Sequence, residues 1–154
     1  MSKNRRSVQV FKRVNYQNIG IIKHETLLEK LKKENNALCI VNTKKSAQMI
    51  YKELSGEGMY HLSTSMYPRH RKRVLRAIRK RLENNEKCIL ISTSLVEAGV
   101  DLDFESVYRQ ISGLDSMIQA AGRCNREGKR KVLESGVYIF DLEESRNVPI
   151  RVAD

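Results

Sequence analysis

Hydrophobic and polar positions alternate along the chain in two patterns. The run ALCIVN at 37–42 is short, apolar and of strand length. In the next stretch, TKKSAQMIYKEL at 43–54, apolar residues recur at the spacing of a helix. A strand followed by a helix with one buried face is therefore predicted. The positions that would share this buried face are Ala47, Ile50, Tyr51 and Leu54.

The same alternation continues to the end of the sequence. Further strands are predicted at 59–63, 87–93, 105–110 and 136–142, an outer strand at 8–14, and helices at 24–35, 68–82, 94–99 and 115–124. Strands that alternate with helices of these lengths favour an α/β fold with a largely parallel central sheet. No repeat or Pro/Gly-rich linker divides the chain. We expect one domain over 24–154, with an N-terminal extension or linker over 1–23.

The charge balance changes this picture by indicating a polyanionic partner. The 154 residues include 29 Lys and Arg against 18 Asp and Glu, a net charge of +11. Such an excess is typical of nucleic-acid binding, although it also serves solubility alone. The sequence shows no secretory signal pattern and no apolar run long enough to cross a membrane. A soluble, cytoplasmic protein without a membrane partner is expected.

The cysteines do not indicate a metal site. Cys39, Cys88 and Cys124 are odd in number, lack CxxC spacing, and do not pair with a histidine at ligand spacing. Cys39 and Cys88 lie within apolar runs, so we expect them to be small buried hydrophobic residues.

Short polar side chains follow three of the predicted strands: Asn42 and Thr43, then Ser63 and Thr64, then Ser92 and Thr93. The carboxyl ends of parallel strands meet at one edge of a sheet, where working residues gather. Each pair alone fits an ordinary helix N-cap. Together, on a basic chain, they favour a row of phosphate contacts, which position a nucleic acid without reading its sequence.

The predicted helix PRHRKRVLRAIRKRLE at 68–83 is strongly basic. Its apolar residues form one stripe, and no acid occurs between Arg69 and Arg81. The basic residues either form a solvated outer face or a lane of positive charge beside nucleic acid.

A second basic feature lies in QAAGRCNREG at 119–128. If the helix extends that far, Gln119, Gly122, Arg123 and Arg126 share one face. Two guanidiniums one turn apart can clamp a triphosphate, and an arginine at a γ-phosphate accelerates its transfer by roughly 10³–10⁵. The alternative is a surface pair bound to acids such as Glu127.

Gly99 and Asp101 follow the strand at 87–93. Asp101 could accept hydrogen bonds from a ribose hydroxyl or from the arginines, or it could simply cap a turn.

Several of these segments resemble superfamily 2 helicases. ISTSLVEAGVDLDF at 91–104 resembles motif V, and 119–128 resembles motif VI, matching Q-x-x-G-R-x-x-R at every fixed position. CIVNTKKSAQMIYKEL at 39–54 looks like motif IV. The stretches at 60–82 and 112–128 are similar to blocks of the CRISPR-associated helicase–nuclease of type I systems, which commonly has His where Ser65 stands. The likeness covers roughly residues 36–142.

The resemblance implies a RecA-like three-layer α/β/α sandwich, the second RecA-like domain of an ATP-dependent translocase that unwinds DNA in the 3′ to 5′ direction. By position, Arg126 would be the arginine finger and Arg123 its partner at the γ-phosphate, with Gln119 in support. Gly99 and Asp101 would line the nucleotide side of the cleft. Thr43, Thr64 and Thr93 would contact the DNA backbone, and the strand-end pattern adds Asn42, Ser63 and Ser92 to these contacts.

The sequence as printed contains no GxxxxGK[ST] loop, no Asp-Glu metal motif and no His-Asp dyad of the family's nuclease domain. ATP with Mg²⁺ would then be bound mainly by a first RecA-like domain, and we expect no ATPase activity from this chain alone. The implied partners are single-stranded DNA, that P-loop domain, the nuclease domain of the same system and a CRISPR surveillance complex. Two alternatives stay open: a stand-alone nucleic-acid-binding module, and the equivalent domain of another superfamily 2 helicase.

Overall fold

The structure is a computed structural model that describes residues 15–63, 66–93, 102, 104–111 and 136–143. Its strands are β1 (Asn15–Ile22), β2 (Asn36–Ile40), β3 (Met59–Leu62), β4 (Cys88–Ser92), β5 (Ser106–Gln110) and β6 (Gly136–Leu142). Its helices are α2 (His24–Lys33), α3 (Lys44–Leu54) and α4 (Pro68–Glu83). The described strands after β1 and all three helices lie where the hydrophobic pattern predicted them, within a few residues at each end.

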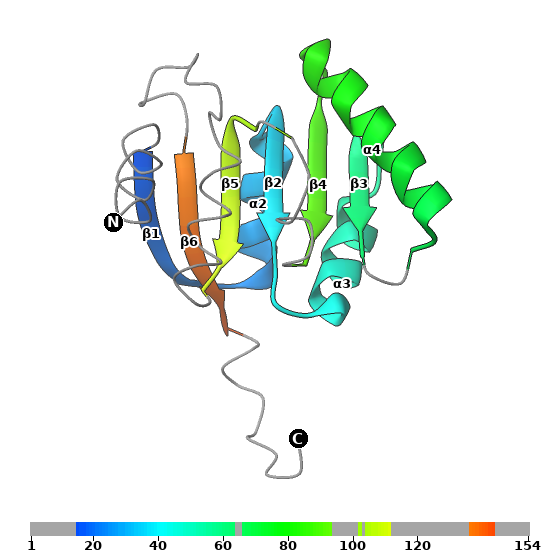
Figure 1. Ribbon diagram of the computed structural model, residues 1–154. Coiled ribbons are helices and arrows are strands. Elements are labelled where there is room, and N and C mark those ends of the chain that lie inside the picture. The colour runs from blue at the N-terminus through cyan, green and yellow to red at the C-terminus, as the bar shows by residue number, and fades with distance from the viewer. Residues whose placement is uncertain (1–14, 64–65, 94–101, 103, 112–135, 144–154) are drawn as a thin grey trace, which may run out of the picture.

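The strands form one six-stranded sheet in the order β1-β6-β5-β2-β4-β3. Every neighbouring pair is parallel, so all carboxyl ends lie along one edge, the lower edge in Figure 1. Helices α2 and α3 contribute to the core on one face, and α4 contributes to the core on the other. The predicted α/β fold with a parallel sheet between helical layers is confirmed.

The central strands are buried on both faces because helices cover both sides of the sheet. All five residues of β2 and all five of β4 are buried. Alternate side chains of each strand point to opposite faces. Leu38 and Leu90 therefore join Ile78 of α4 in one core, whereas Cys39 and Ile91 join the core beneath α2 and α3.

Helix α3 follows the predicted pattern with one exception. Ala47, Ile50 and Leu54 are buried, but Tyr51, which the helical spacing also placed on the core face, is 38% exposed. Its ring stacks on that of His61 in β3, with 5.6 Å between ring centroids. The prediction for Tyr51 was wrong because this side chain lies over β3, the last strand of the sheet, where it stays partly exposed.

Strand β1 was not predicted at its observed position. The outer strand expected at 8–14 lies outside the described residues, and the structure instead has a strand at Asn15–Ile22, paired with β6. Its sequence, NYQNIGII, is half polar and contains a glycine with positive φ at a register shift, so its strand signal is weak. Residues 15–22 thus extend the sheet at the edge opposite β3.

Cys39 and Cys88 are both buried, as predicted. Among the described residues, no helix is long and apolar enough to span a membrane.

Candidate nucleic-acid interface

The strand ends predicted to meet are neighbours in the sheet. In the parallel register, Ile40 of β2 lies level with Ser92 of β4, and Ser92 lies level with Leu62 of β3. The polar residues that follow these positions therefore gather along one part of the carboxyl edge. We call this part the polar edge, defined by Asn42, Thr43, Ser63, Ser92 and Thr93.

Thr43 caps the N-terminus of α3. Its Oγ1 accepts a hydrogen bond from the Ser46 backbone N–H at 3.1 Å and lies 3.0 Å from the Ser46 hydroxyl. Thr43 is nonetheless exposed, and the exposed Lys44 and Lys45 follow it directly. The helix-cap interpretation of this residue is confirmed. Its position also puts a hydroxyl and two ammonium groups on the same exposed corner.

Asn42 ties the end of β2 to the end of β5. Its backbone N–H donates to Gln110 Oε1, and its side-chain Nδ2 donates to the Ile111 carbonyl, both at 3.0 Å. Gln110 Nε2 in turn lies 3.5 Å from Asp141 Oδ1 on β6. The side-chain amide of Asn42 is thus held in one orientation at the surface, with a second amide hydrogen still to donate.

Gln110 and Asp141 belong to the same edge, and the sequence analysis did not single them out. Both stand at or next to the carboxyl end of a predicted strand. The rule used for the other strand ends would have identified them, but neither strand is followed by the pair of short polar residues that marks the other three.

The serines of the polar edge serve the fold. Ser92 is 1% exposed, and its Oγ lies 3.0 Å from the Leu62 carbonyl and 3.2 Å from that of Thr93. The Ser63 carbonyl accepts a hydrogen bond from the Met66 N–H at 3.3 Å. Ser92 thus joins β4 to β3, and its contact with nucleic acid stays a prediction.

Thr93 differs from its neighbours. It is 7% exposed, and its Oγ1 has no hydrogen-bond partner among the described residues. A buried hydroxyl left in this state costs about 1–3 kcal/mol. Thr93 is therefore the one polar-edge hydroxyl with an unmet hydrogen bond in the described part of the chain.

The remaining candidates lie outside the described residues. Thr64 falls between Ser63 and Met66, while Gly99 and Asp101 follow Thr93 along the chain. Gln119, Arg123 and Arg126 belong to the segment between β5 and β6. Their roles stay predictions.

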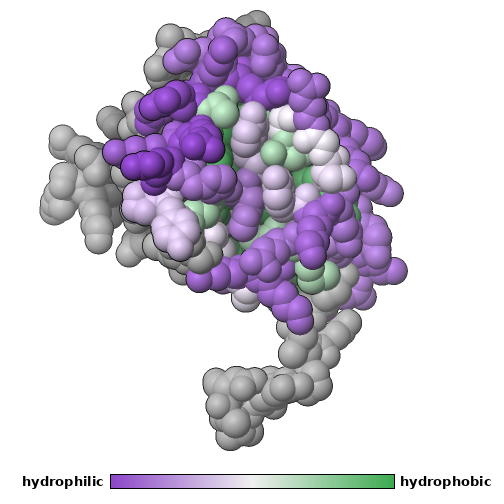
Figure 2. Space-filling model, turned by 90° about the vertical axis from the view of Figure 1, so that its right-hand side faces the viewer, coloured by the Kyte–Doolittle hydropathy of each residue, from purple (hydrophilic) through white to green (hydrophobic). Residues whose placement is uncertain are grey.

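Helix α4 follows β3 in the chain, close to the polar edge (Figure 1), and it is strongly basic. Its exposed cations are Arg69, Lys72, Arg73, Arg76, Arg79 and Lys80, called here the cation row. Among the described residues, no acid forms an ion pair with any of them. The side of the molecule seen in Figure 2 is largely hydrophilic. The cation row is available to a polyanion.

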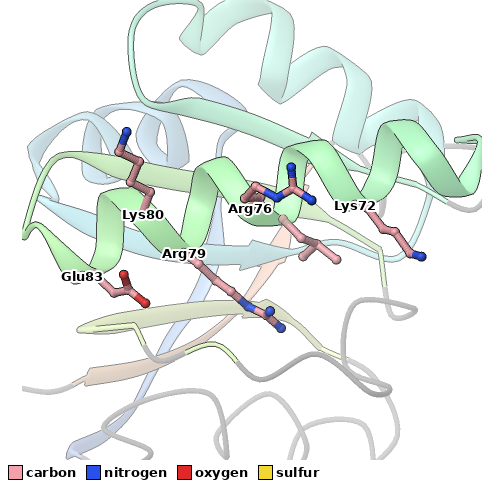
Figure 3. A pocket seen from close by; sticks show the side chains of 6 residues that line it. Lys72, Arg76, Arg79, Lys80 and Glu83 are labelled. Carbon is pink, nitrogen blue, oxygen red and sulfur yellow. The ribbon is translucent and has the colours of Figure 1, made fainter.

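A groove of about 570 Å³ runs along the cation row. It is lined by Lys72, Leu75, Arg76, Arg79, Lys80 and Glu83. Figure 3 shows their side chains leaving the helix at intervals along its length. Such a groove offers several cations in series to a chain of phosphates.

Arg81 is the structural exception in α4. Its guanidinium donates to Tyr60 Oη at 2.9 Å, to the Lys87 carbonyl at 3.2 Å and to Glu57 Oε1 at 3.2 Å. The hydrogen bond that Arg81 donates to Tyr60, and after it the one to Glu57, raises the pKa of Arg81 above its ordinary value. Arg81 fastens the C-terminal end of α4 to the sheet.

Arg109, in β5, is a buried cation that the sequence analysis missed. It is 1% exposed and the largest of the fully buried side chains. Burial raises the pKa of the Cys39 thiol to about 12, and the positive charge of Arg109 acts against this increase. An arginine within an apolar strand carries no local sequence signal of burial, since arginine is usually exposed.

Comparisons with known proteins agree with this architecture. The family model of the C-terminal region of the CRISPR-associated nuclease/helicase Cas3 matches residues 33–129. A CRISPR-associated nuclease/helicase Cas3 from Methanothermobacter thermautotrophicus is 32% identical over 116 residues, covering 73% of this chain and 14% of the relative. The chain spans between 4% and 24% of the length of the curated relatives it matches.

Solved structures show the same fold. The crystal structure of T. fusca Cas3 with ADP has a TM-score of 0.70 and 22% identity, covering 88% of this chain and 19% of that one. A chain of a CRISPR RNA-guided surveillance complex in a pre-nicking state has a TM-score of 0.66 and 19% identity, covering 91% of this chain and 20% of that one.

Proposed function

Because the chain belongs to the family of C-terminal regions of the CRISPR-associated nuclease/helicase Cas3, we propose that it is the C-terminal motor half of an ATP-dependent single-stranded DNA translocase. In this proposal the motor moves in the 3′ to 5′ direction during CRISPR interference in the cytoplasm. The N-terminal P-loop domain, the nuclease domain and a CRISPR surveillance complex are its partners.

The observation that carries the proposal is the polar edge. Asn42 and Thr43 follow β2, Thr93 follows β4, and Ser63 follows β3, three strands that are neighbours in register. Thr43 is exposed beside two lysines, and the Thr93 hydroxyl has an unmet hydrogen bond within the described residues. In the proposal, these groups and Thr64 donate to successive phosphates of one DNA strand.

Neutral donors suit a strand that has to move. A hydrogen bond between neutral groups contributes about 1 kcal/mol net, so each contact can break and re-form during a step. Phosphate contacts also do not depend on the base sequence. A translocase must avoid a preference for particular sequences, so such contacts suit it. The cation row adds attraction at longer range without fixing the register.

The nucleotide side of the proposal rests on the chemistry of the donor set. When bound, ATP with Mg²⁺ supplies the phosphoryl bond whose hydrolysis drives movement. Arg126 donates to the γ-phosphate as an arginine finger and Arg123 donates beside it, because planar guanidiniums suit phosphate oxygens. Gln119 orients this pair, while Gly99 and Asp101 line the nucleotide. The two arginines fit only the anionic phosphate end of ATP. The P-loop domain would hold the remainder of the nucleotide and the Mg²⁺.

The test combines this chain with the separately produced P-loop domain of its own system and measures DNA-stimulated ATP hydrolysis. Activity should appear only in the mixture, and Arg126→Ala should lower it roughly 10³-fold or more. Arg130→Ala, a nearby change in charge outside the Q-x-x-G-R-x-x-R pattern, is the matched control. ATP turnover by this chain alone that depends on Arg126 would contradict the proposal. DNA binding without activity, in the mixture and in a covalent fusion of the two, would favour a stand-alone nucleic-acid-binding module.

A further inference from the structure

An exposed tyrosine lies between the polar edge and the cation row. Tyr67 is 82% exposed, more than any other exposed large hydrophobic residue in the described part of the chain. It directly precedes α4 and directly follows Met66, whose backbone N–H donates to the Ser63 carbonyl. A single exposed aromatic residue is common on protein surfaces, so its surroundings decide whether it has a role.

The backbone of Tyr67 is held firmly although its ring is exposed. Pro68 follows it, and a residue before proline is confined to extended conformations such as the φ of −63° and ψ of 144° observed here. The Tyr67 carbonyl also accepts the Arg71 N–H at 2.9 Å. The ring is therefore presented from a fixed point at the start of α4, so little backbone freedom is lost when a ligand contacts it.

The ring borders a hollow with a cationic lining. This hollow of about 550 Å³ is lined by Tyr67, Pro68, Arg69, His70 and Arg73. Its volume lies within the range of small-ligand sites, which is about 300–1,000 Å³. Arg69 and Arg73 are exposed and stand one helical turn apart, so both reach the same side of the hollow.

We propose that Tyr67 is a base-stacking platform for single-stranded DNA, with Arg69 and Arg73 binding the phosphates on either side of the stacked nucleotide. An aromatic ring flanked by cations is the combination that binds unpaired nucleotides without sequence preference. In this proposal, Tyr67 lies where the DNA strand passes from the polar edge to the cation row. The platform rests on the proposed function, since it adds a base contact to the same DNA path.

The experiment compares two labelled oligonucleotides of equal length, an oligothymidine and its abasic counterpart, by fluorescence anisotropy at about 50 mM salt. Tyr67→Ala should weaken binding of oligothymidine about 5- to 100-fold and leave binding of the abasic strand unchanged. Tyr67→Phe should bind both as the unaltered chain does. Tyr51→Ala, which removes another exposed tyrosine, is the matched control, and circular dichroism confirms that each variant is folded.

Two results would overturn the platform, and they differ. Equal binding of oligothymidine by the unaltered chain and by Tyr67→Ala would remove the stacking role while leaving the DNA contacts of the proposed function intact. If the unaltered chain bound neither oligonucleotide, the DNA contacts of the proposed function would fail together with the platform.

Discussion

The polar edge and the cation row lie side by side but are built in opposite ways. Most groups of the polar edge are short, neutral and engaged within the protein, as the bonds of Asn42, Thr43 and Ser92 show. The side chains of the cation row are long and exposed, whereas Arg81 of the same helix is half-buried and held by three partners. One surface has fixed geometry and little charge, and the other has much charge and little fixed geometry.

The difference separates two requirements for binding a moving polyanion. Fixed donors define where each phosphate sits, whereas loosely held cations raise the local concentration of the strand and release counterions when it binds. The two surfaces should therefore respond differently to salt, and substitutions can separate them.

The largest expected effect is on the cation row. Replacing Lys72, Arg76 and Arg79 together with Gln should weaken single-stranded DNA binding roughly 100-fold at about 50 mM salt and reduce the salt slope by about 2, since each phosphate contact contributes about 0.7. Titrations at several salt concentrations measure both quantities. Lys30, Lys32 and Lys33 of α2 provide the control, because replacing them removes equal charge from a helix on the opposite face. Equal losses from both triple variants would show that net charge alone governs binding.

A smaller effect, of a different kind, is expected at Thr93. Thr93→Val should weaken DNA binding about 5-fold without changing the salt slope, because a neutral hydroxyl releases no counterion. The same change should raise the free energy of unfolding by about 1 kcal/mol, since it removes a buried hydroxyl without a partner in the described residues. Urea unfolding measures the stability, and Thr93→Ser is the control for the binding. A destabilised Thr93→Val would mean that the hydroxyl has a structural role.

Gln110→Ala should affect stability more than binding. It removes the acceptor of the Asn42 backbone N–H, one of the two hydrogen bonds that tie Asn42 to the end of β5, which should lower the free energy of unfolding by about 1–2 kcal/mol. We expect DNA affinity to fall by only about 2- to 3-fold, since the phosphate donors themselves remain. Thermal unfolding and anisotropy on the same samples check the pair of values. A binding loss greater than that of Thr93→Val would make Gln110 part of the contact surface.

The smallest expected effect is that the two buried thiols, Cys39 and Cys88, do not react with a thiol reagent. Their reactivity also reports whether each variant stays folded. Burial raises the pKa values of Cys39 and Cys88 from 9.0 to about 12. In a Cys124→Ser background, neither thiol should react with a disulfide reagent at about pH 8 until the chain unfolds, because thiolate is the reactive form. The folded state keeps these protons longer than the unfolded state does. Their contribution to stability is therefore complete below pH 9.0 and is lost as the pH rises towards 12. Rapid labelling of a native variant would show that its core has opened.

The hydrophobic pattern of the sequence correctly predicted the elements that depend on neighbouring residues. The proline at the start of α4, the cap of α3 and the apolar run of β6 are all properties of neighbouring residues, and these elements lie where they were expected. The meeting of the strand ends could also be predicted, because parallel strands share their carboxyl edge.

Features that depend on the order of strands could not be predicted. Asn42 bonds to Gln110, 68 positions along the chain, only because β5 lies beside β2. The burial of Arg109 and the exposure of Tyr51 likewise follow from which strand is central and which is last. Thr64, Gly99, Asp101, Gln119, Arg123 and Arg126 lie outside the described residues, and their assignments still rest on the motif resemblance.

The attachment of Arg81 has a mechanical consequence. Helix α4 has 16 residues and is therefore about 24 Å long. Arg81 anchors its far end to Tyr60 in β3, to the Lys87 carbonyl before β4 and to Glu57, while its near end starts at Tyr67. If α4 binds DNA as proposed, a pull on its first turns would be resisted at its far end by these contacts with the sheet. The helix that carries the cation row is thus also the helix that Arg81 fixes to the sheet.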